Sequence, residues 1–367
     1  MPTFGSSPPF TATLDGLITM PSLPTTGARE HADPHVFIVG AGASRAACPN
    51  GDAEGRRLPV MADLIDLVGL RPLLAQHGIE SQEGDFEAVY DGVVQSGDKE
   101  FADELERRVH HYFSQLALPE TATAYDYLLL SLRPKDLVAT FNWDPLLAQA
   151  FRRHEGKIAL PQLAFLHGNV AFGYCAEHRR CGWIDDHCAS CGKRFEPTPL
   201  LYPIRDKNYT ANPFIRSQWA LLEHHIQFAY FLTIFGYRAP ETDVAAREAM
   251  IKVWKRNENR TLAEVELIDI KSQEELHANW KDFIAREHYI AADSIKKSYV
   301  ARHPRRSCDA LAAATVMLRP WKDDWLPERE SFDDLRAWVN PLWEEETRLA
   351  GTGQQFSGRP CSEHHEA

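Results

Sequence analysis

Several features that would direct a chain to a membrane or to nucleic acid are missing from this sequence. It has no run of about 18 apolar residues, and its first residues lack the basic start and apolar stretch of a secretory leader. Basic residues are outnumbered, since 40 Lys and Arg face 52 Asp and Glu, and the net charge of -12 repels a phosphate backbone. We therefore expect a cytoplasmic protein that binds neither a membrane nor nucleic acid directly.

One stretch departs from the acidic balance of the chain. Residues 302–306 contain three arginines. This stretch indicates either a local basic patch or an ordinary solvated surface, and the sequence alone does not separate the two.

Cysteine is scarce outside one short segment. Four of the seven cysteines fall within residues 175–191, and a dense cluster in a chain without a leader is typical of metal binding. Four thiolates can close a tetrahedral zinc site. His178 or His187 could take the place of a cysteine, and independent free thiols are the alternative. The spacing C-x5-C-x6-C-x2-C predicts a structural zinc ion held by Cys175, Cys181, Cys188 and Cys191.

The chain divides by composition and by periodicity. Pro, Ser, Thr and Gly dominate residues 1–34, which predicts a mobile N-terminal arm. Helical spacing prevails over residues 60–135, and this length exceeds a single crossover, so we interpret the segment as a helical insertion. The predicted organisation is a domain over 35–270 containing this insertion and a zinc module at 171–198, a helical C-terminal extension over 271–350, and a disordered tail over 351–367.

Short apolar segments rich in β-branched residues alternate with the helical stretches. Such segments are typical of parallel strands that are buried on both faces, so the pattern predicts a Rossmann-like α/β fold with a parallel sheet. Ligands of such sheets bind at the carboxyl ends of the strands, which makes the residues after each strand candidates for a site. The predicted strands are residues 35–39, 137–140, 163–166, 228–235 and 265–270, with helices over 212–226 and 242–254.

The first predicted strand runs directly into a glycine-rich turn. Its two glycines let the backbone approach a pyrophosphate closely, and a helix that starts there offers free N–H groups. Arg45 stands where the usual dinucleotide fingerprint has a third glycine, so a plain tight turn is the alternative. The candidate pyrophosphate-binding residues are Gly40, Ala41, Gly42 and Ser44.

Polar residues follow the next two strands. Asn142 has no charge to lose and can hold a ribose hydroxyl or orient a water molecule, with Asp144 nearby. Either residue could instead cap the helix expected to start at Pro145. His167 follows the third strand and can accept a proton near neutral pH, with a purely structural histidine as the alternative.

The last two predicted strands end at Gly236 and Asp269. A glycine at a strand end lets a ligand come close to the backbone, and an acid there can accept a hydrogen bond from a ribose or an adenine amine. A solvated surface acid is the alternative for Asp269. Asp243, near the start of the following helix, is interpreted as a helix cap.

Taken in order, these motifs resemble the sirtuin superfamily. Gly-Ala-Gly-x-Ser at 40–44, Asn-x-Asp at 142–144, Leu-His-Gly at 166–168 and the cysteine cluster follow the family order. Gly-Tyr-x-x-Pro-x-x-Asp at 236–243 resembles a sirtuin-like bacterial branch. The resemblance covers residues 36–270 apart from the insertion.

The resemblance implies a role for each candidate residue. The glycine turn with Ser44 would hold the pyrophosphate of NAD, and the four cysteines would bind the structural zinc. Asn142 and Asp144 would lie beside the nicotinamide and its ribose, with His167 as general base. Gly236 and Asp269 would face the adenosine.

Two departures from the deacylase pattern of the family bear on the activity. Residues 45–50 replace the deacylase loop Gly-Ile-Pro-Asp-Phe-Arg, and residues 201–209 stand where a deacylase has the strand that pairs with an acylated peptide. Loss of the peptide edge with retention of Asn142 and His167 points to water as the acceptor. This combination resembles the pattern of sirtuin-like bacterial NAD hydrolases that act in anti-phage defence.

The resemblance therefore implies an NAD glycohydrolase that cleaves NAD, its substrate, to nicotinamide and ADP-ribose. An NAD-dependent protein deacylase and a catalytically silent NAD or ADP-ribose sensor are the alternatives. Because unchecked NAD hydrolysis would kill the host, we expect a regulated activity and a homo-oligomer. Bacterial relatives pair with a hexameric translocase-type ATPase or an Argonaute-like protein, and the sequence does not show which partner applies.

Overall fold

The computed structural model describes most of the 367 residues of the chain. Nearly all of the predicted N-terminal arm and most of the predicted tail lie outside the described residues, so both stay predictions. The described residues are 33–79, 85–204, 209, 211–239, 243–284, 288–328, 331–352, 354 and 356.

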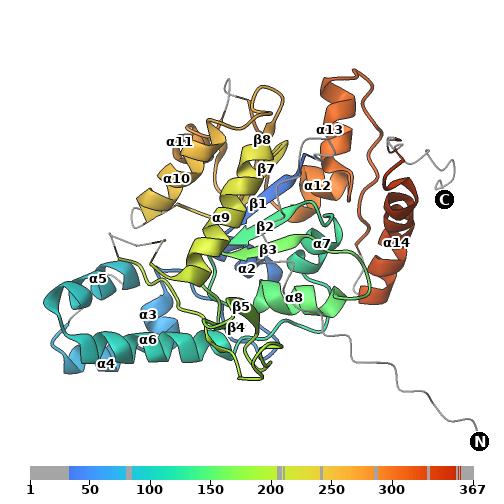
Figure 1. Cartoon of the computed structure of the whole chain (residues 1–367). Helices are drawn as coiled ribbons and strands as arrows, with labels where there is room; N and C mark the ends of the chain where they lie inside the picture. Colours follow the sequence, from blue (N-terminus) through green and yellow to red (C-terminus); the bar gives the residue numbers. More distant parts are fainter. Residues whose placement is uncertain are drawn as a thin grey trace, which may run out of the picture.

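A parallel sheet of six strands forms the centre of the protein (Figure 1). All five residues of its inner strand β1 (His35–Val39) are buried, as expected for a largely apolar strand covered by helices on both faces. The predicted α/β fold class is confirmed. The strand order is β3 (Gln162–Phe165), β2 (Leu137–Thr140), β1, β7 (Phe231–Phe235), β8 (Glu264–Ile268) and β9 (Ile290–Ala292).

Two parts of the sheet differ from the sequence prediction. The strand predicted over 228–235 begins at Phe231, because the preceding helix α9 (Pro213–Phe228) continues to Phe228. The sixth strand, β9, lies in the segment 271–350, whose pattern predicts mostly helix. Three residues are too few for the alternation of a strand to stand out in a sequence.

Helices pack on both faces of the sheet (Figure 1). On one face α9 lies against β2 and β3, with α10 (Val244–Trp254) packed beside it, so both helices predicted in this region are present. Asn212 caps α9, since its side-chain oxygen accepts from the Phe214 amide at 2.8 Å. Across the sheet, Phe231 of β7 packs against Tyr299 of α12 (Tyr299–Arg302) and against α13 (Ser307–Thr315), and α12 in turn packs on α7 (Ala124–Leu130).

The strand order reverses next to β1. The chain places β2 and β3 on one side of β1, and then β7, β8 and β9 on the other side. Loops leave neighbouring strands in opposite directions at such a reversal, and ligands of parallel sheets bind in the crevice that results. The topology therefore singles out the carboxyl ends of β1 and β7.

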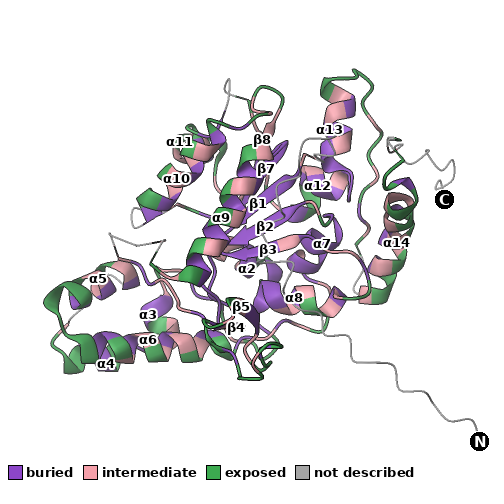
Figure 2. Ribbon diagram, viewed as in Figure 1, coloured by how far each residue is buried: buried purple, intermediate pink, exposed green. Residues whose placement is uncertain are grey.

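A helical arm projects from one side of the sheet (Figure 1), within the segment predicted as a helical insertion. Asp85 and Asp98 begin its two longest helices, and each carboxylate accepts a hydrogen bond from a backbone N–H of the first turn. Figure 2 shows that the outer faces of these helices are exposed, whereas the strands of the large sheet are buried. The helices of the arm are α3 (Leu64–Val68), α4 (Arg71–Gln76), α5 (Phe86–Ser96) and α6 (Lys99–Ser114).

The long C-terminal helix α14 (Phe332–Leu349) is joined to the rest of the protein by buried ion pairs. Arg305 is 1 % exposed and pairs with Glu346, while Arg306 is 5 % exposed and pairs with Glu345. Two of the three arginines in this stretch are therefore internal, so it is neither a basic patch nor a solvated surface. Among the described residues, no helix has both the length and the apolar content needed to cross a membrane.

Candidate functional site

The predicted site residues follow successive strands and gather at one edge of the sheet. Gly40 follows β1 and Gly236 follows β7, so both lie where the strand order reverses. Asn142, His167 and Asp269 follow β2, β3 and β8. Because the strands are parallel, their carboxyl ends meet at the same edge.

The glycine turn after β1 packs directly on the loop after β7. The Gly42 amide donates to the Gly236 carbonyl at 2.9 Å. A Cβ atom on Gly42 would lie 2.7 Å from the Cα atom of Gly236, and one on Gly40 would lie 2.7 Å from the Cα atom of Tyr237. Gly236 itself has φ 60°, a left-handed conformation that favours glycine. Close packing of two loops is therefore a sufficient reason for these glycines, whether or not a ligand approaches them.

The Asn142 side chain joins the end of β2 to the glycine turn. Its Nδ2 donates to the Gly40 carbonyl at 2.8 Å and to Ser44 Oγ at 2.9 Å. A carbonyl can only accept, so the nitrogen of the side-chain amide must face Gly40, and its Oδ1 points away from the turn. Within the described part of the chain, Oδ1 makes no hydrogen bond, which leaves it as an acceptor for a ligand. Asn142 therefore does not cap the following helix.

Asp144 meets the same network from the other side. Its Oδ2 accepts from Ser44 Oγ at 2.7 Å, and its Oδ1 accepts from the Leu146 amide at 3.1 Å, at the start of α8 (Leu146–His154). The capping interpretation thus holds for Asp144, and the residue also contacts the site. Burial raises the pKa of Asp144 to about 6, although its hydrogen bonds favour the charged form.

A tyrosine outside all the predicted motifs completes the network. Tyr125 on α7 is fully buried, and its hydroxyl lies 2.7 Å from Ser44 Oγ and 3.3 Å from Asn142 Nδ2. Since Ser44 donates to Asp144, the Tyr125 hydroxyl is the donor to Ser44. Burial, with a contribution from Asp144, raises the pKa of Tyr125 and keeps this hydroxyl protonated. The sequence gives no signal for this role, because helical spacing explains Tyr125 as an ordinary core residue.

His167 lies among aromatic side chains and beside a second acid. Its ring meets Phe141 edge to face with 4.8 Å between centroids, and it stacks on Tyr209 at 5.9 Å. His167 Nε2 lies 3.8 Å from Asp243 Oδ1, and each of the two side chains is 6 % exposed. The Tyr237 hydroxyl donates to the other oxygen of Asp243 at 3.0 Å.

Asp243 differs from its sequence interpretation as a helix cap. Although it stands at the start of α10, its side chain makes no capping hydrogen bond there and faces His167 instead. In the sequence, the one indication that Asp243 belongs to the site is its position as the last residue of the motif at 236–243. Residues 240–242 of that motif lie outside the described residues.

Asp269 lies at the same edge of the sheet, apart from this network. Its Oδ1 accepts from the Lys271 amide at 3.1 Å, and its own amide donates to the Ala292 carbonyl of β9 at 3.0 Å. These bonds close the turn after β8 and leave the carboxylate half-buried. Its predicted contact with adenosine stays a prediction.

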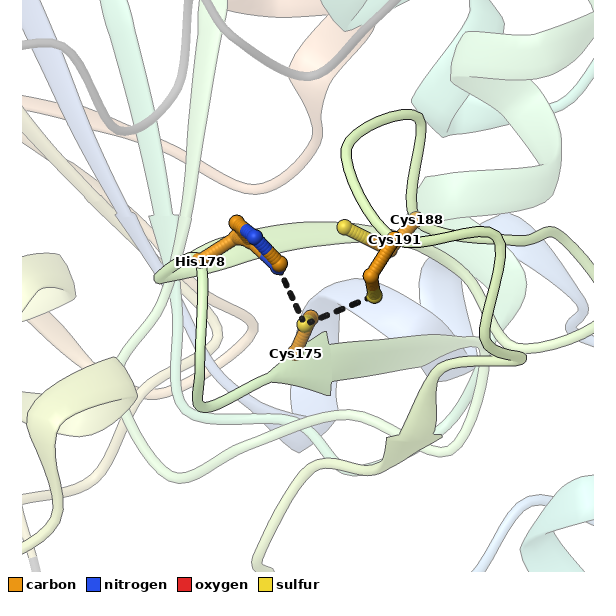
Figure 3. A group of neighbouring side chains, drawn as sticks. All are labelled: Cys175, His178, Cys188 and Cys191. Carbon is orange, nitrogen blue, oxygen red and sulfur yellow. Dashed lines mark hydrogen bonds between the residues drawn. The ribbon is translucent and has the colours of Figure 1, made fainter.

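The cysteine cluster belongs to a small antiparallel sheet made of β4 (Phe172–Cys175), β5 (Arg180–Trp183) and β6 (Glu196–Pro197). Cys175 Sγ lies 3.6 Å from His178 Nδ1 and 3.8 Å from Cys191 Sγ. These distances fit zinc, because two ligand atoms that each lie about 2.3 Å from a tetrahedral zinc ion are about 3.8 Å apart. With four protein ligands, such an ion would be structural. Figure 3 shows Cys175, His178, Cys188 and Cys191 facing one another. Their ligand atoms all lie within 4.8 Å of one another.

The predicted set of four cysteine ligands needs one correction. Cys181 is outside the group, and His178 takes its place. In the β4–β5 ladder Cys181 is paired with Tyr174, so its side chain is on the same face as Tyr174 and on the opposite face from Cys175. His187, the other histidine considered, forms a bridge with Arg194 and is not in the group.

Hydrogen bonds join this small sheet to the site. Thr198, next to β6, donates its hydroxyl to the Asn169 carbonyl at 2.9 Å. Asn169 Nδ2 in turn donates to the Asp144 carbonyl at 2.6 Å. Both side chains are buried, so the position of the Asp144 backbone depends on the folded small sheet.

Comparison with known proteins gives only distant likenesses. Neither a protein-family model nor a curated protein matches the chain. A solved complex of a Sir2 homologue with NAD is 13 % identical over 75 % of this chain and 90 % of that one, with a TM-score of 0.36. A structure of a Sir2 enzyme is 12 % identical over 77 % of this chain and 94 % of that one, with a TM-score of 0.39. At these values the likeness carries no conclusion about activity.

Proposed function

We propose that the chain is a sirtuin-like NAD glycohydrolase, which hydrolyses NAD to nicotinamide and ADP-ribose. The bond between the nicotinamide nitrogen and C1′ of the ribose breaks, water supplies a hydroxyl group to C1′, and the remaining proton passes to a base. The observation that carries the proposal is Asn142, whose amide nitrogen is bound to the turn at the strand-order reversal while its oxygen is left to a ligand.

Asn142 would orient a reactant. Its Oδ1 can accept a hydrogen bond from the attacking water or from the carboxamide of nicotinamide. The bonds from Nδ2 to Gly40 and Ser44 fix the side chain before a ligand arrives, and such preorganisation is a main source of catalytic effect. A neutral amide also tolerates the positive charge that develops on the ribose.

His167 would take up the proton, and Asp144 would stabilise the charge that develops on the ribose. His167 would bond a ribose hydroxyl or the water and take up the proton, as a histidine can near neutral pH. A buried carboxylate such as Asp144 would stabilise an oxocarbenium-like ribose electrostatically, to the extent that it is ionised. Since its pKa is raised to about 6, Asp144 is mostly ionised only above that pH.

A structural zinc ion would be held by Cys175, His178, Cys188 and Cys191. The ion would cross-link the turn after β4 to the Cys188–Cys191 hairpin. Its contribution would be to the stability of the small sheet, and it would take no part in the reaction.

The test is incubation of the purified full chain with NAD, with nicotinamide and ADP-ribose measured by chromatography. Asn142→Ala and His167→Ala should each lower the rate by about 100-fold or more, because each removes an interaction with a reacting group. Asn340→Ala on α14 and His111→Ala on α6 are matched controls at positions away from the edge, and they should keep the wild-type rate. Full activity of both site variants would defeat the assignment.

The same incubation separates the other two activities. Nicotinamide release that requires an acetyl-lysine peptide would identify a deacylase. Tight NAD binding without any nicotinamide release, alone and with partner proteins, would identify a sensor.

A role as a regulated effector of bacterial anti-phage defence is the biological part of the proposal. It rests on the resemblance of the motifs at 40–44, 142–144 and 236–243. It predicts that cells carrying the wild-type chain lose NAD on phage infection, whereas cells carrying Asn142→Ala do not. Light scattering of the pure protein tests the expected homo-oligomer, and affinity capture from infected cells tests for an ATPase or Argonaute-like partner.

A further inference from the structure

A buried acid stands behind the proposed general base. His167 Nε2 faces Asp243 Oδ1 at 3.8 Å, and neither side chain is more than 6 % exposed. A carboxylate this close to a buried imidazole interacts with it strongly, because little water screens the pair. His167 follows β3 and Asp243 stands at the start of α10, so the pairing depends on the fold and not on local sequence.

The Asp243 carboxylate does not cap α10, although its position in the chain suggests a helix cap. At the start of α10 it could accept a hydrogen bond from the first turn, yet it makes none. Its second oxygen, Oδ2, accepts from the Tyr237 hydroxyl at 3.0 Å. Burial, with Asp243 next in importance, raises the pKa of Tyr237, so this hydroxyl remains a donor.

We propose that Asp243 is a positioning residue for His167: its negative charge, 3.8 Å from Nε2, favours the tautomer with the proton on Nε2 and makes Nδ1 the basic nitrogen of the ring. Tyr237 would hold the carboxylate in turn. The inference deepens the proposed function and rests on His167 being the base of that reaction. When His167 takes a proton from water or from a ribose hydroxyl, the imidazolium that forms would face the Asp243 carboxylate, and no further group is needed for the balance.

The aromatic surroundings define the other groups that act on the pair. Tyr209 stacks on the His167 ring, and its pKa is raised by burial and by Asp243. Glu87 of α5 acts on Tyr237 from the helical arm. Phe141 packs on both His167 and Tyr237, with 4.1 Å between the stacked ring centroids in the second case, which keeps water from the pair.

The first arm of the test measures His167 directly in the protein without NAD. NMR of histidine-labelled full chain, with the His167 signal assigned from its loss in His167→Gln, gives the titration midpoint of the ring. Asp243→Asn keeps the shape and removes the charge, so the midpoint should fall by about one pH unit, a tenfold weaker proton affinity. Asp185→Asn, at an exposed carboxylate of the small sheet, is the matched control and should leave the midpoint unchanged.

Tyr237→Phe is a second variant that tests the proposal even if Asp243→Asn does not fold. It removes the hydroxyl that shares Asp243, which leaves the carboxylate more basic, so the His167 midpoint should rise. An unchanged midpoint in a folded Asp243→Asn, or in Tyr237→Phe if the first variant does not fold, would overturn the proposal. The NMR result does not depend on NAD cleavage. If the wild-type chain were inactive but the variants shifted the His167 midpoint as expected, the proposed function would be refuted and the interaction of Asp243 with His167 would stand.

The second arm measures catalysis. Asp243→Asn should lower kcat by about 100-fold with little change in KM, because the loss falls on proton transfer and not on binding. Asp243→Glu retains the charge and should restore part of kcat. A KM effect alone, or equal losses in Asp243→Asn and Asp243→Glu, would indicate a merely structural residue and overturn the proposal.

Discussion

Two buried acids, Asp144 in the loop after β2 and Glu266 within β8, have similar surroundings but differ in their place relative to the candidate site. Asp144 lies at the carboxyl ends of the strands and accepts from Ser44, and burial raises its pKa to about 6. Glu266 lies in the middle of β8 and accepts from the Thr233 hydroxyl at 3.1 Å and the Tyr299 amide at 2.7 Å, and burial raises its pKa to about 7. Both acids thus weaken the fold near neutral pH.

The partners of Glu266 form a closed row through the sheet. His35 Nε2 lies 2.7 Å from Thr233 Oγ1, and His35 Nδ1 lies 2.8 Å from Ser307 Oγ on α13. Burial lowers the pKa of His35 to about 3, so the ring is neutral. In this row each side chain is hydrogen-bonded to the next. The network of Asp144, in contrast, includes Asn142, whose Oδ1 is available to a ligand. Position at a strand end, more than burial or a shifted pKa, therefore distinguishes the candidate site.

The sharpest way to break this comparison is to neutralise each acid in turn. Asp144→Asn should lower NAD cleavage by about 100-fold, because it removes the charge beside the proposed ribose site. Glu266→Gln should keep nearly the wild-type rate. Steady-state rates at pH 8 check both, and equal losses in the two variants would remove the distinction between the regions.

Metal removal should affect only one of the two regions. The small sheet is linked through Thr198 and Asn169 to the Asp144 backbone, and no such link is described for Glu266. His178→Ala should therefore lower the zinc content and reduce NAD cleavage by about tenfold or more. Cys181→Ser is the matched control and should retain zinc, because its side chain faces away from the group.

Elemental analysis of the purified variants together with NAD cleavage rates checks this prediction. Loss of zinc from Cys181→Ser but not from His178→Ala would restore the set of four cysteines. Zinc loss with no loss of rate would mean that the site does not depend on the small sheet.

Tyr125 supplies a hydroxyl to the network of Asp144, and Thr233 supplies one to the network of Glu266. Removing each hydroxyl should give a smaller difference in rate between the two regions. Tyr125→Phe removes the donor to Ser44, which should lower NAD cleavage about tenfold and the free energy of unfolding by about 1 kcal/mol. Thr233→Val should cost a similar free energy and leave the rate unchanged. Urea unfolding and rates on the same preparations decide the matter, and a rate loss in Thr233→Val would count against the separation of the two regions.

The smallest effect on the rate is expected for Glu266, whose protonation changes the pH dependence of stability instead. A folded-state pKa of about 7 for Glu266, above its ordinary 4.5, makes stability fall as pH rises from 4.5 to 7. Glu266→Gln removes this loss and should gain up to about 3 kcal/mol over wild type by pH 8, with no gain below pH 4.5. His35 acts in the opposite sense, since stability falls as pH drops from 6.5 to 3.

Urea unfolding across this pH range checks the prediction. Asp144→Asn is the companion variant, and its gain should develop between pH 3.8 and 6. Parallel stability curves for wild type and Glu266→Gln would show that this acid is not protonated preferentially in the folded state.

The sequence predicts the sheet well and the site in part, for reasons that differ between residues. Strands such as β1 stand out because burial on both faces requires a continuous apolar run, and the residues after each strand then fall at one edge. Tyr125, Asp243 and Asn169 escape prediction because their roles depend on tertiary contacts with distant segments. Cys181 is misassigned because ligand spacing does not reveal which face of a strand pair a side chain occupies.

The buried arginine Arg305 has a consequence for how the chain can be shortened. Its guanidinium bonds Glu346 of α14 and also the carbonyls of Leu132 and Ala159, which lie just before β2 and β3. A chain cut ahead of α14 would keep the cation inside and lose its counter-ion, a change that costs about 3 to 5 kcal/mol in comparable proteins. The last helix therefore stabilises the segments that lead into β2 and β3, and a chain shortened before α14 would carry an uncompensated buried charge.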